Sequence, residues 1–399
     1  MRTAQTPHAA PSALTILAFA VLAGGLPGCS GLDSDPVTLV NHMRVLAIHA
    51  DPPYIAGPGS SATPGPPITT VITPLVVGAG DPAKLCYAWV LCPFALSKDG
   101  NFRCLDERLE VDLGTGDTAK VGMSDALASV SKLKELGDQI GDGIKLPGGG
   151  AGGGEAGPGT VSFEFYVQFM ISEPRVWGGT CPTNALETLH KVCPQRDGCL
   201  AGYSKLAFAT SPAQANRNPV LTGLTLDAVD WPASLTPTAA PVAEQDGANP
   251  FDLGTAGLAM EPTWTTDSIE VIRPATTDQP EVRESLTFSW FSTNGEFAAS
   301  KSSQYFADTR FWPASPQDKT DEEVTIWLIA RDNRNGLAWM SRRLKVDSKA
   351  QVRMHLLCRV DQSLAGCDEA EPCLTDAPPD PASCSQRCVA DATLPWCKP

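Results

Sequence analysis

The stretch TVSFEFYVQFMIS, residues 160–172, alternates two sets of side chains without interruption. One set is apolar: Val161, Phe163, Phe165, Val167, Phe169 and Ile171. The intervening set is Ser162, Glu164, Tyr166, Gln168 and Met170. A period of two over this length is that of a β-strand with one face on a core and the other partly solvated. The chain is therefore expected to contain a sheet that packs on a core.

Other runs rich in β-branched and aromatic residues are separated by Pro, Gly and Ser clusters, as strands are in β proteins. They are residues 44–50, 68–77, 84–92, 202–210, 220–229, 268–273, 285–291, 324–330 and 337–346. The 35 prolines and 35 glycines suit a loop-rich β protein, because proline interrupts helix interiors. Pro74 removes a ladder donor, so its strand is expected at an edge or with a bulge. The RDNRNG segment between the last two runs predicts a hairpin.

One insertion breaks this pattern. Residues 124–140 place Leu127, Val130, Leu133, Leu136 and Ile140 on one helical stripe, with Ser124 as the expected N-cap. The glycine-rich run 148–159 follows and predicts a flexible coil. Together they form a helix and glycine-rich insertion over 124–159.

The second half resembles the immunoglobulin-like and PKD-like β-sandwich modules of bacterial surface proteins. The resemblance rests on Trp290 in mid-strand, the glycine in STNGEF that follows, and the closing hairpin. The first half repeats the pattern more loosely, with Trp89 in the place of Trp290. The resemblance implies a mainly β fold: a first sandwich over 44–212, a second over 219–347, and a small Cys-rich C-terminal module.

Thirteen cysteines divide into one single residue, Cys29, and two sets of six. The first set is Cys86, Cys92, Cys104, Cys181, Cys193 and Cys199. The second set is Cys358, Cys367, Cys373, Cys384, Cys388 and Cys397. Even sets in an exported chain indicate disulfides, and the absence of any CxxC pair disfavours a metal site. The tail 358–399 is expected to be a disulfide-rich module or an extension clamped to the second sandwich.

The N-terminus predicts export. Residues 1–28 read as a signal peptide with a short apolar region, and Leu26-Pro27-Gly28-Cys29 resembles the lipobox of bacterial lipoproteins. That resemblance implies that Cys29 is acylated and begins a tether over 29–43. Ser30 implies sorting to the outer membrane, on its periplasmic or cell-surface face. The alternative is ordinary cleavage, with Cys29 a spare thiol.

Charge and motifs exclude several functions. A net charge of −15 disfavours nucleic acid and electrostatic binding to anionic lipid. The histidines are scattered singly, and the Ser129–Lys132 and Ser131–Lys134 spacings lack the companion motifs of a Ser/Lys enzyme. We therefore expect no enzyme activity, no catalytic residues, no cofactor and no metal.

Three aromatic side chains form the candidate binding surface: Phe291, Trp327 and Trp339 lie on strand faces opposite the expected core. The alternative is that the neighbouring sandwich or the tail covers this face. The expected function is a non-catalytic envelope lipoprotein that acts as a binding or structural subunit. Its partners would be the membrane, through the lipid anchor, and a protein or a glycan. Alternatives are a glycan- or surface-binding adhesin and, further off, a hydrolase with an unrecognised site.

Overall fold

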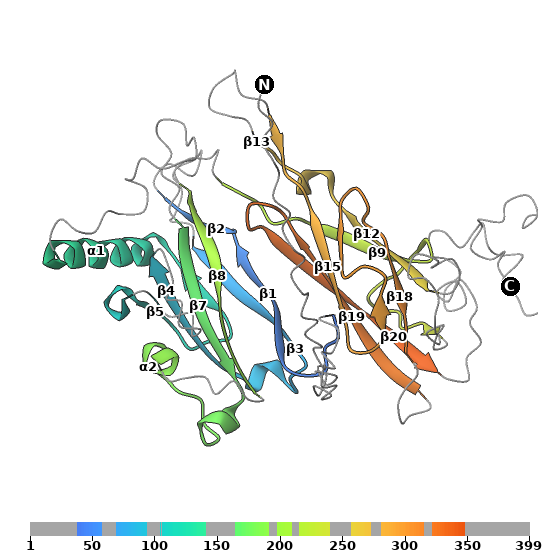
Figure 1. The fold of residues 1–399 in the computed structure, drawn as a ribbon, viewed down its shortest axis with the longest axis horizontal. Helices are drawn as coiled ribbons and strands as arrows, with labels where there is room; N and C mark the ends of the chain where they lie inside the picture. The colour runs from blue at the N-terminus through green and yellow to red at the C-terminus, as the bar shows by residue number, and fades with distance from the viewer. Residues whose placement is uncertain are drawn as a thin grey trace, which may run out of the picture. The chain divides into compact units, whose positions relative to one another are not determined.

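The computed structural model describes residues 38–57, 69–93, 104, 106–140, 164–190, 198–209, 215–239, 257–272, 281–314 and 321–347. All of them belong to one compact unit. The chain is mainly β, and four of its sheets pack face to face in pairs (Figure 1). The signal segment 1–28, Cys29, the run 148–159 and the tail 358–399 lie outside the described residues.

The first sheet pair joins a three-stranded sheet, in the order β1-β3-β6, to a five-stranded sheet, in the order β2-β8-β7-β4-β5. Its strands are β1 (Arg44–Asp51), β2 (Tyr54–Ala56), β3 (Thr70–Val77), β4 (Cys86–Pro93), β5 (Val111–Gly114), β6 (Ala119–Val121), β7 (Glu164–Ser172) and β8 (Cys199–Ala209). Both sheets contribute to one core around the fully buried Trp89, with Ile72 from the smaller sheet and Val167 from the larger.

The second sheet pair joins two five-stranded sheets, in the orders β10-β9-β12-β18-β16 and β11-β20-β19-β15-β17. Its strands are β9 (Leu221–Leu226), β10 (Val229–Asp230), β11 (Thr238–Ala239), β12 (Leu258–Trp264), β15 (Thr287–Ser292), β16 (Glu296–Phe297), β17 (Lys301–Ser303), β18 (Thr309–Trp312), β19 (Asp321–Arg331) and β20 (Leu337–Asp347). A separate ribbon pairs β13 (Val271–Ile272) with β14 (Val282–Arg283). Trp290 and Phe311 are fully buried between the two five-stranded sheets.

Strand β7 confirms the alternating pattern but corrects what its second face meets. Phe165, Val167, Phe169 and Ile171 point into the core, as expected. The opposite face is not solvated over most of its length, because Gln168 and Met170 are also buried. The short helix α2 (Ala185–His190) packs over this face together with the 3-10 helix η3 (Pro174–Trp177). The segment that directly follows β7 in the sequence therefore covers the face that the pattern predicts as partly solvated.

Helix α1 (Met123–Ile140) lies where the sequence predicts it, but its start and its buried face differ. The backbone N–H of Gly122 donates to Asp125 Oδ2 (2.8 Å), so Asp125 rather than Ser124 fastens the first turn. Ala126 and Ser129 are buried, whereas Leu127 is 56% exposed. Small side chains let the helix lie close to the strands. No helix within the described ranges is long and apolar enough to cross a membrane.

Two local features of the strands, the position of Pro74 and the hairpin, can be compared with the sequence-based expectations. Strand β3 is the central strand of its sheet and not an edge strand, but β6 pairs with it only over Thr70–Ile72, so no described strand lies beside Pro74 on that side. On its other side Pro74 pairs with Ile48, and the pairing of β1 with β3 shifts register between Val45 and Ala47. Strands β19 and β20 pair in continuous antiparallel register from Asp321↔Asp347 to Arg331↔Leu337. The expected hairpin is therefore present, closed by a five-residue loop.

Candidate functional site: the junction of the sheet pairs

The outer faces of two sheets meet in an apolar junction. Leu46, Ala47 and Val77 from the first pair pack with Ile329 and Leu337 from the second. The partly buried residues that join this cluster are Leu75, Phe291, Trp327 and Trp339. The three aromatic side chains proposed from the sequence as a binding surface thus lie against the first sheet pair.

The alternation of β15 and β19 explains why these aromatics reach the junction. Phe288 and Trp290 of β15 point into the core of the second pair, which turns Phe291 to the opposite face. In β19, Leu328 is a core residue and Trp327 and Ile329 have the opposite orientation. Trp339 meets His49 of β1 edge to face, with ring centroids 5.5 Å apart. Aromatic pairs of this kind add stabilisation to that of area burial alone.

The segment that precedes β1 fastens one end of this junction. The N–H of Val40 donates to the carbonyl of Ser292 (2.7 Å), and the N–H of Ser292 donates to the carbonyl of Thr38 (3.0 Å). Leu39 and Ser292 form a parallel bridge, so residues 38–40 extend the sheet at the end of β15. Residues that lead into the first sheet pair therefore bind the second.

The segment that follows β8 fastens the other end. Asn218 donates through Nδ2 to the carbonyl of Ala50 in the first pair (2.7 Å) and accepts through Oδ1 from the N–H of Leu337 in the second (2.8 Å). One amide side chain thus bridges β1 and β20. Because β1 is bound from both directions, relative motion of the two pairs would break these bonds.

A charged cluster holds the β19–β20 loop against the same segment. Arg334 donates to Glu284 Oε1 (3.1 Å), to Glu270 Oε2 (3.2 Å) and to the carbonyl of Ala215 (2.9 Å). Burial raises the pKa of the Glu284 carboxyl, while a hydrogen bond from the Glu270 N–H opposes that rise. Asp332 accepts from the N–H groups of Arg334 and Gly336 (both 2.7 Å) and so shapes the loop.

A cavity of about 380 Å³ opens beside the junction. It is lined by Arg44, Val45, Leu46, Phe169, Leu200, Ala201 and Phe291. Its volume is near the lower end of pockets that bind small molecules, roughly 300–1,000 Å³. Gly202 leaves room for the Phe169 ring, because a Cβ at position 202 would lie 2.5 Å from that ring. The cavity can accept apolar groups and offers one positive charge. Neither its position nor the role of Gly202 could be found from sequence spacing.

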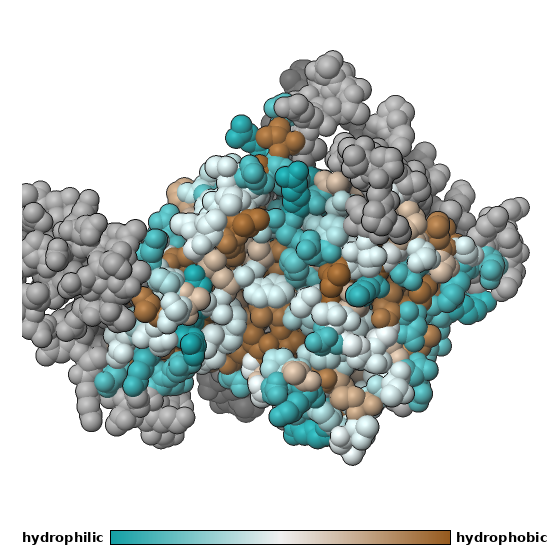
Figure 2. Space-filling model, turned by 180° about the vertical axis from the view of Figure 1, so that it is seen from behind, coloured by the Kyte–Doolittle hydropathy of each residue, from teal (hydrophilic) through white to brown (hydrophobic). Residues whose placement is uncertain are grey.

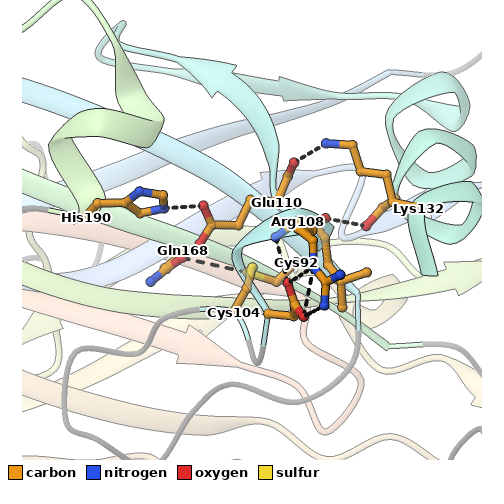
Figure 3. Close-up of a disulfide and its surroundings, with 10 residues drawn as sticks. Cys92, Cys104, Arg108, Glu110, Lys132, Gln168 and His190 are labelled. Carbon is orange, nitrogen blue, oxygen red and sulfur yellow. Dashed lines mark hydrogen bonds and ion pairs between the residues drawn. A yellow bond between two sulfur atoms is a disulfide. The ribbon is translucent and has the colours of Figure 1, made fainter. Parts of the chain in front are cut away.

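A second cluster surrounds the disulfide between Cys92 and Cys104 (Figure 3). His190 of α2 lies 2.6 Å from Glu110 Oε2, and Lys132 of α1 donates to the Glu110 carbonyl oxygen (2.5 Å). Glu110 lies between the 3-10 helix η2 (Glu107–Leu109) and β5. A carboxylate beside an imidazole can serve acid–base chemistry. Here the Glu110 side chain is only 1% exposed, and its contacts join α2 to the edge of the sheet.

The Ser–Lys spacings fall in the same region. Ser129 is fully buried, and its hydroxyl donates to the Leu109 carbonyl (3.4 Å). Lys132 binds the next carbonyl of the chain, so this pair fastens α1 to the turn before β5. Ser131 is exposed on the same helix, and the Lys134 side chain lies outside the described residues. Among the described residues, no group of His, Cys, Asp or Glu is arranged to hold a metal ion.

Disulfides hold the loops of the first sheet pair. Cys86 at the start of β4 is bonded to Cys181, and Cys92 near the end of β4 is bonded to Cys104. Cys199 at the start of β8 is also disulfide-bonded. Cys193, Cys29 and the six cysteines of the tail lie outside the described residues.

Comparison with known proteins adds little. No protein-family model matches the sequence, and no curated protein matches it. Among solved structures, the protocadherin GammaB4 extracellular domain matches at 10% identity with a TM-score of 0.14. That match covers 77% of this chain and 51% of the other, so the chain spans about half the length of that structure.

Proposed function

We propose that the chain is an exported lipoprotein anchored through Cys29 to the outer membrane, where it acts as a non-catalytic binding or structural subunit. In this proposal the sheet pairs are two immunoglobulin-like sandwiches, and the tail 358–399 is a disulfide-rich module. The observation that carries the proposal is the junction itself, because segments on both sides of the first pair bind the second. A pair fixed in this way suits a rigid spacer or docking surface better than a flexible linker.

Two further observations support the proposal. Disulfides form and persist in oxidising compartments, and Cys86, Cys92, Cys104, Cys181 and Cys199 are all bonded. The tether from Cys29 to Thr38 is nine residues, a span of at most about 30 Å. Residues 38–40 bind the end of β15, so the described part of the chain begins within that span of the proposed anchor.

The adhesin alternative requires an open aromatic platform. Phe291, Trp327 and Trp339 do not provide one, because each packs against the junction cluster. We therefore favour a protein contact over a glycan contact for the surface formed by these three residues.

Membrane fractionation tests the anchor. Cys29→Ala is expected to lose incorporation of labelled palmitate and to move from the membrane to the soluble fraction. Ser30→Ala is the matched control and should retain both label and location. Ser30→Asp should redirect the labelled protein to the inner membrane if the expected sorting rule applies. Retention of Cys29→Ala in the membrane fraction would overturn the anchor.

A further inference from the structure

Exposed apolar side chains gather at one end of the second sheet pair, the end at which β9 and β15 begin. Among the described residues, four of the seven large apolar side chains that are exposed lie there: Val220, Val271, Tyr305 and Phe306. Tyr305 is 77% exposed and Phe306 is 78% exposed. Figure 1 shows β13, which contains Val271, at the top of the second sheet pair, and Figure 2 shows an apolar patch among hydrophilic side chains at the top of the described surface. These four residues are called the apolar rim below.

Hydrogen bonds connect Val220 and Val271 to the beginning of β15. The N–H of Val220, which directly precedes β9, donates to Ser268 Oγ (2.8 Å), and Ser268 is three residues before Val271. The carbonyl of Glu270, next to Val271, accepts from the N–H of Glu284 (2.9 Å). The N–H of Glu270 donates in turn to Glu284 Oε2 (3.0 Å). Glu284 lies three residues before β15, so these bonds join the start of β9 to the start of β15.

Tyr305 and Phe306 stand on a turn that is fixed at the same place. The N–H groups of Ser303 and Phe306 each donate to the other's carbonyl (3.3 and 2.9 Å). Gln304 donates through its N–H to the Leu286 carbonyl (3.0 Å) and accepts through Oε1 from the Leu286 N–H (2.7 Å). A turn fixed by four hydrogen bonds loses little conformational entropy when its tip binds. The turn therefore presents both aromatic side chains as a preformed convex tip.

The tip carries no charge. Residues 302–307 are SSQYFA, and the nearest charged residues in the sequence are Lys301 and Asp308. An uncharged apolar tip enters an apolar phase at far lower cost than a charged one does. Aromatic rings with a polar handle suit a bilayer surface, where the ring contacts lipid and the phenol hydroxyl stays hydrated. Because lipids are fluid, they surround a convex tip without a preshaped pocket.

The first described residues run in the direction that leads away from the rim. Leu39 and Ser292 form a parallel bridge, so Thr38 is the end of its segment nearer to the start of β15. From Ser292 back to Leu286 the strand spans about 20 Å. The nine residues from Cys29 to Thr38 span up to about 30 Å. An acyl group on Cys29 can therefore enter the same bilayer that the rim touches.

We propose that the apolar rim rests in the surface of the lipid bilayer to which the chain is anchored, with Tyr305 and Phe306 inserted among the lipids. The inference rests on the proposed lipid anchor and adds a second point of membrane contact. A flexible tether alone leaves the tilt of the sheet pair free, whereas a second contact on the same rigid body fixes it. The chain then presents a constant face to a partner.

The contact is apolar rather than electrostatic. The net charge of −15 makes an anionic bilayer repel the chain, whereas a zwitterionic bilayer carries no net charge to do so. Two inserted rings bind weakly on their own, since even a single myristoyl chain gives only marginal membrane binding. The anchor makes the second contact intramolecular and so raises its effective concentration. We therefore expect a contact that depends on an anchor and is stronger on zwitterionic than on anionic lipid.

A substitute anchor allows a test that does not depend on acylation. The Cys29→Ala chain, with a histidine tag in place of residues 1–28, is bound to phosphatidylcholine vesicles that contain a nickel-chelating lipid. Phe306→Trp adds a fluorophore at the tip, and lipids brominated in their acyl chains quench a tryptophan that lies among them. The added fluorescence should be quenched. Tyr203→Trp, at an exposed position in the middle of β8, is the matched control and should be quenched no more than the parent.

The rate of release from these vesicles measures the strength of the contact. After imidazole is added, Tyr305→Ser with Phe306→Ser should leave the vesicles about tenfold faster than the parent, because no inserted rings retain it. Leu127→Ser, which also removes an exposed apolar side chain, is the control and should be released like the parent. Replacing part of the phosphatidylcholine by phosphatidylglycerol should speed the release of the parent.

Absence of added quenching in Phe306→Trp overturns the proposal, as do equal release rates of the double serine variant and the parent. Either result would leave the rim to a protein partner. Slower release from the anionic vesicles would assign the contact to charged groups and would also overturn it. The lipid anchor is decided separately by fractionation of Cys29→Ala in cells, whose outcome changes neither result on the vesicles.

Discussion

Arg331 of β19 donates through Nη2 to the carbonyl oxygen of Leu46 in β1, at 3.0 Å and across 285 residues of sequence. The same guanidinium donates through Nη1 to Ser289 Oγ (3.2 Å). Burial lowers the pKa of Arg331, because the charged form loses water when the sheet pairs meet. The charge is retained at the junction by hydrogen bonds to both sheet pairs.

Arg331→Met is expected to lower the free energy of unfolding by about 1–3 kcal/mol, since it leaves the Leu46 carbonyl without this donor. Arg343→Met on the neighbouring strand is the control. Arg343 and its partner Glu323 are both 54% exposed, and their removal should cost less than about 1 kcal/mol. Urea unfolding measures both, and equal losses would show that Arg331 does not support the junction.

Local order is what the sequence predicts well in this chain. The period of two in β7 and the loop between β19 and β20 depend on residues close in sequence, and both are found. The contacts of Phe291 and Trp327 with the first sheet pair depend on residues more than 200 positions away. The sequence pattern of an apolar strand face is the same whether that face is exposed to solvent or packed against another sheet. For this reason the sequence is consistent both with an exposed binding surface and with a covered face for these aromatic residues.

Helix α1 and the exposed neighbours Tyr305 and Phe306 show a different limit of sequence-based prediction. Periodicity predicts that the stripe with the largest apolar residues is the buried face of α1. In the structure the buried face instead contains the small residues Ala126 and Ser129, which allow close packing. The adjacency of Tyr305 and Phe306 is the one sequence feature that could have indicated a turn, because adjacent side chains of a strand face opposite sides. A turn between Ser-Gln and Ala-Asp lets both face outward, which the strand pattern alone does not reveal.

Ala228→Gly is expected to stabilise the protein by about 0.5–1 kcal/mol. Strands β9 and β10 are joined by Asp227 and Ala228, both with positive φ (51° and 66°). Positive φ at both central residues is typical of a type I′ turn, where glycine is favoured and alanine is strained. Gly295→Ala should have the opposite effect, because its φ is 87° and a Cβ would lie 2.4 Å from the Trp312 carbonyl oxygen. Thermal unfolding of both variants checks the two signs, and a loss of stability in Ala228→Gly would contradict the strain argument.

Loss of the Cys86–Cys181 disulfide should cost about 4 kcal/mol in the double alanine variant, because the bond closes a loop of 95 residues. The main effect lies in the unfolded chain, which becomes more expanded without the bond. Urea unfolding should therefore show both a lower midpoint and a larger m-value. A lower midpoint with an unchanged m-value would instead assign the loss to packing around Cys86, which is buried.

His49 makes the stability of the junction depend on pH. Burial against Trp339 lowers the pKa of the His49 imidazole below its ordinary value of 6.5, while the Asp51 carboxylate acts in the opposite direction. The unfolded chain therefore binds a proton at a higher pH than the folded chain does. Well above pH 6.5 the imidazole is neutral in both states and has no such effect. As the pH falls below 6.5 toward the folded pKa, the unfolded state gains protons first and stability declines.

His49→Gln removes this titration and should flatten the dependence of unfolding free energy on pH in that window. His42→Gln is the matched control, because it makes the same substitution at an exposed histidine that precedes β1. Urea unfolding at a series of pH values from above 6.5 downward measures the slopes of the parent and both variants. A His49→Gln slope equal to that of the parent would show that other groups titrate in this range. A flatter slope for His49→Gln alone would assign the acid sensitivity to the contact between His49 and Trp339.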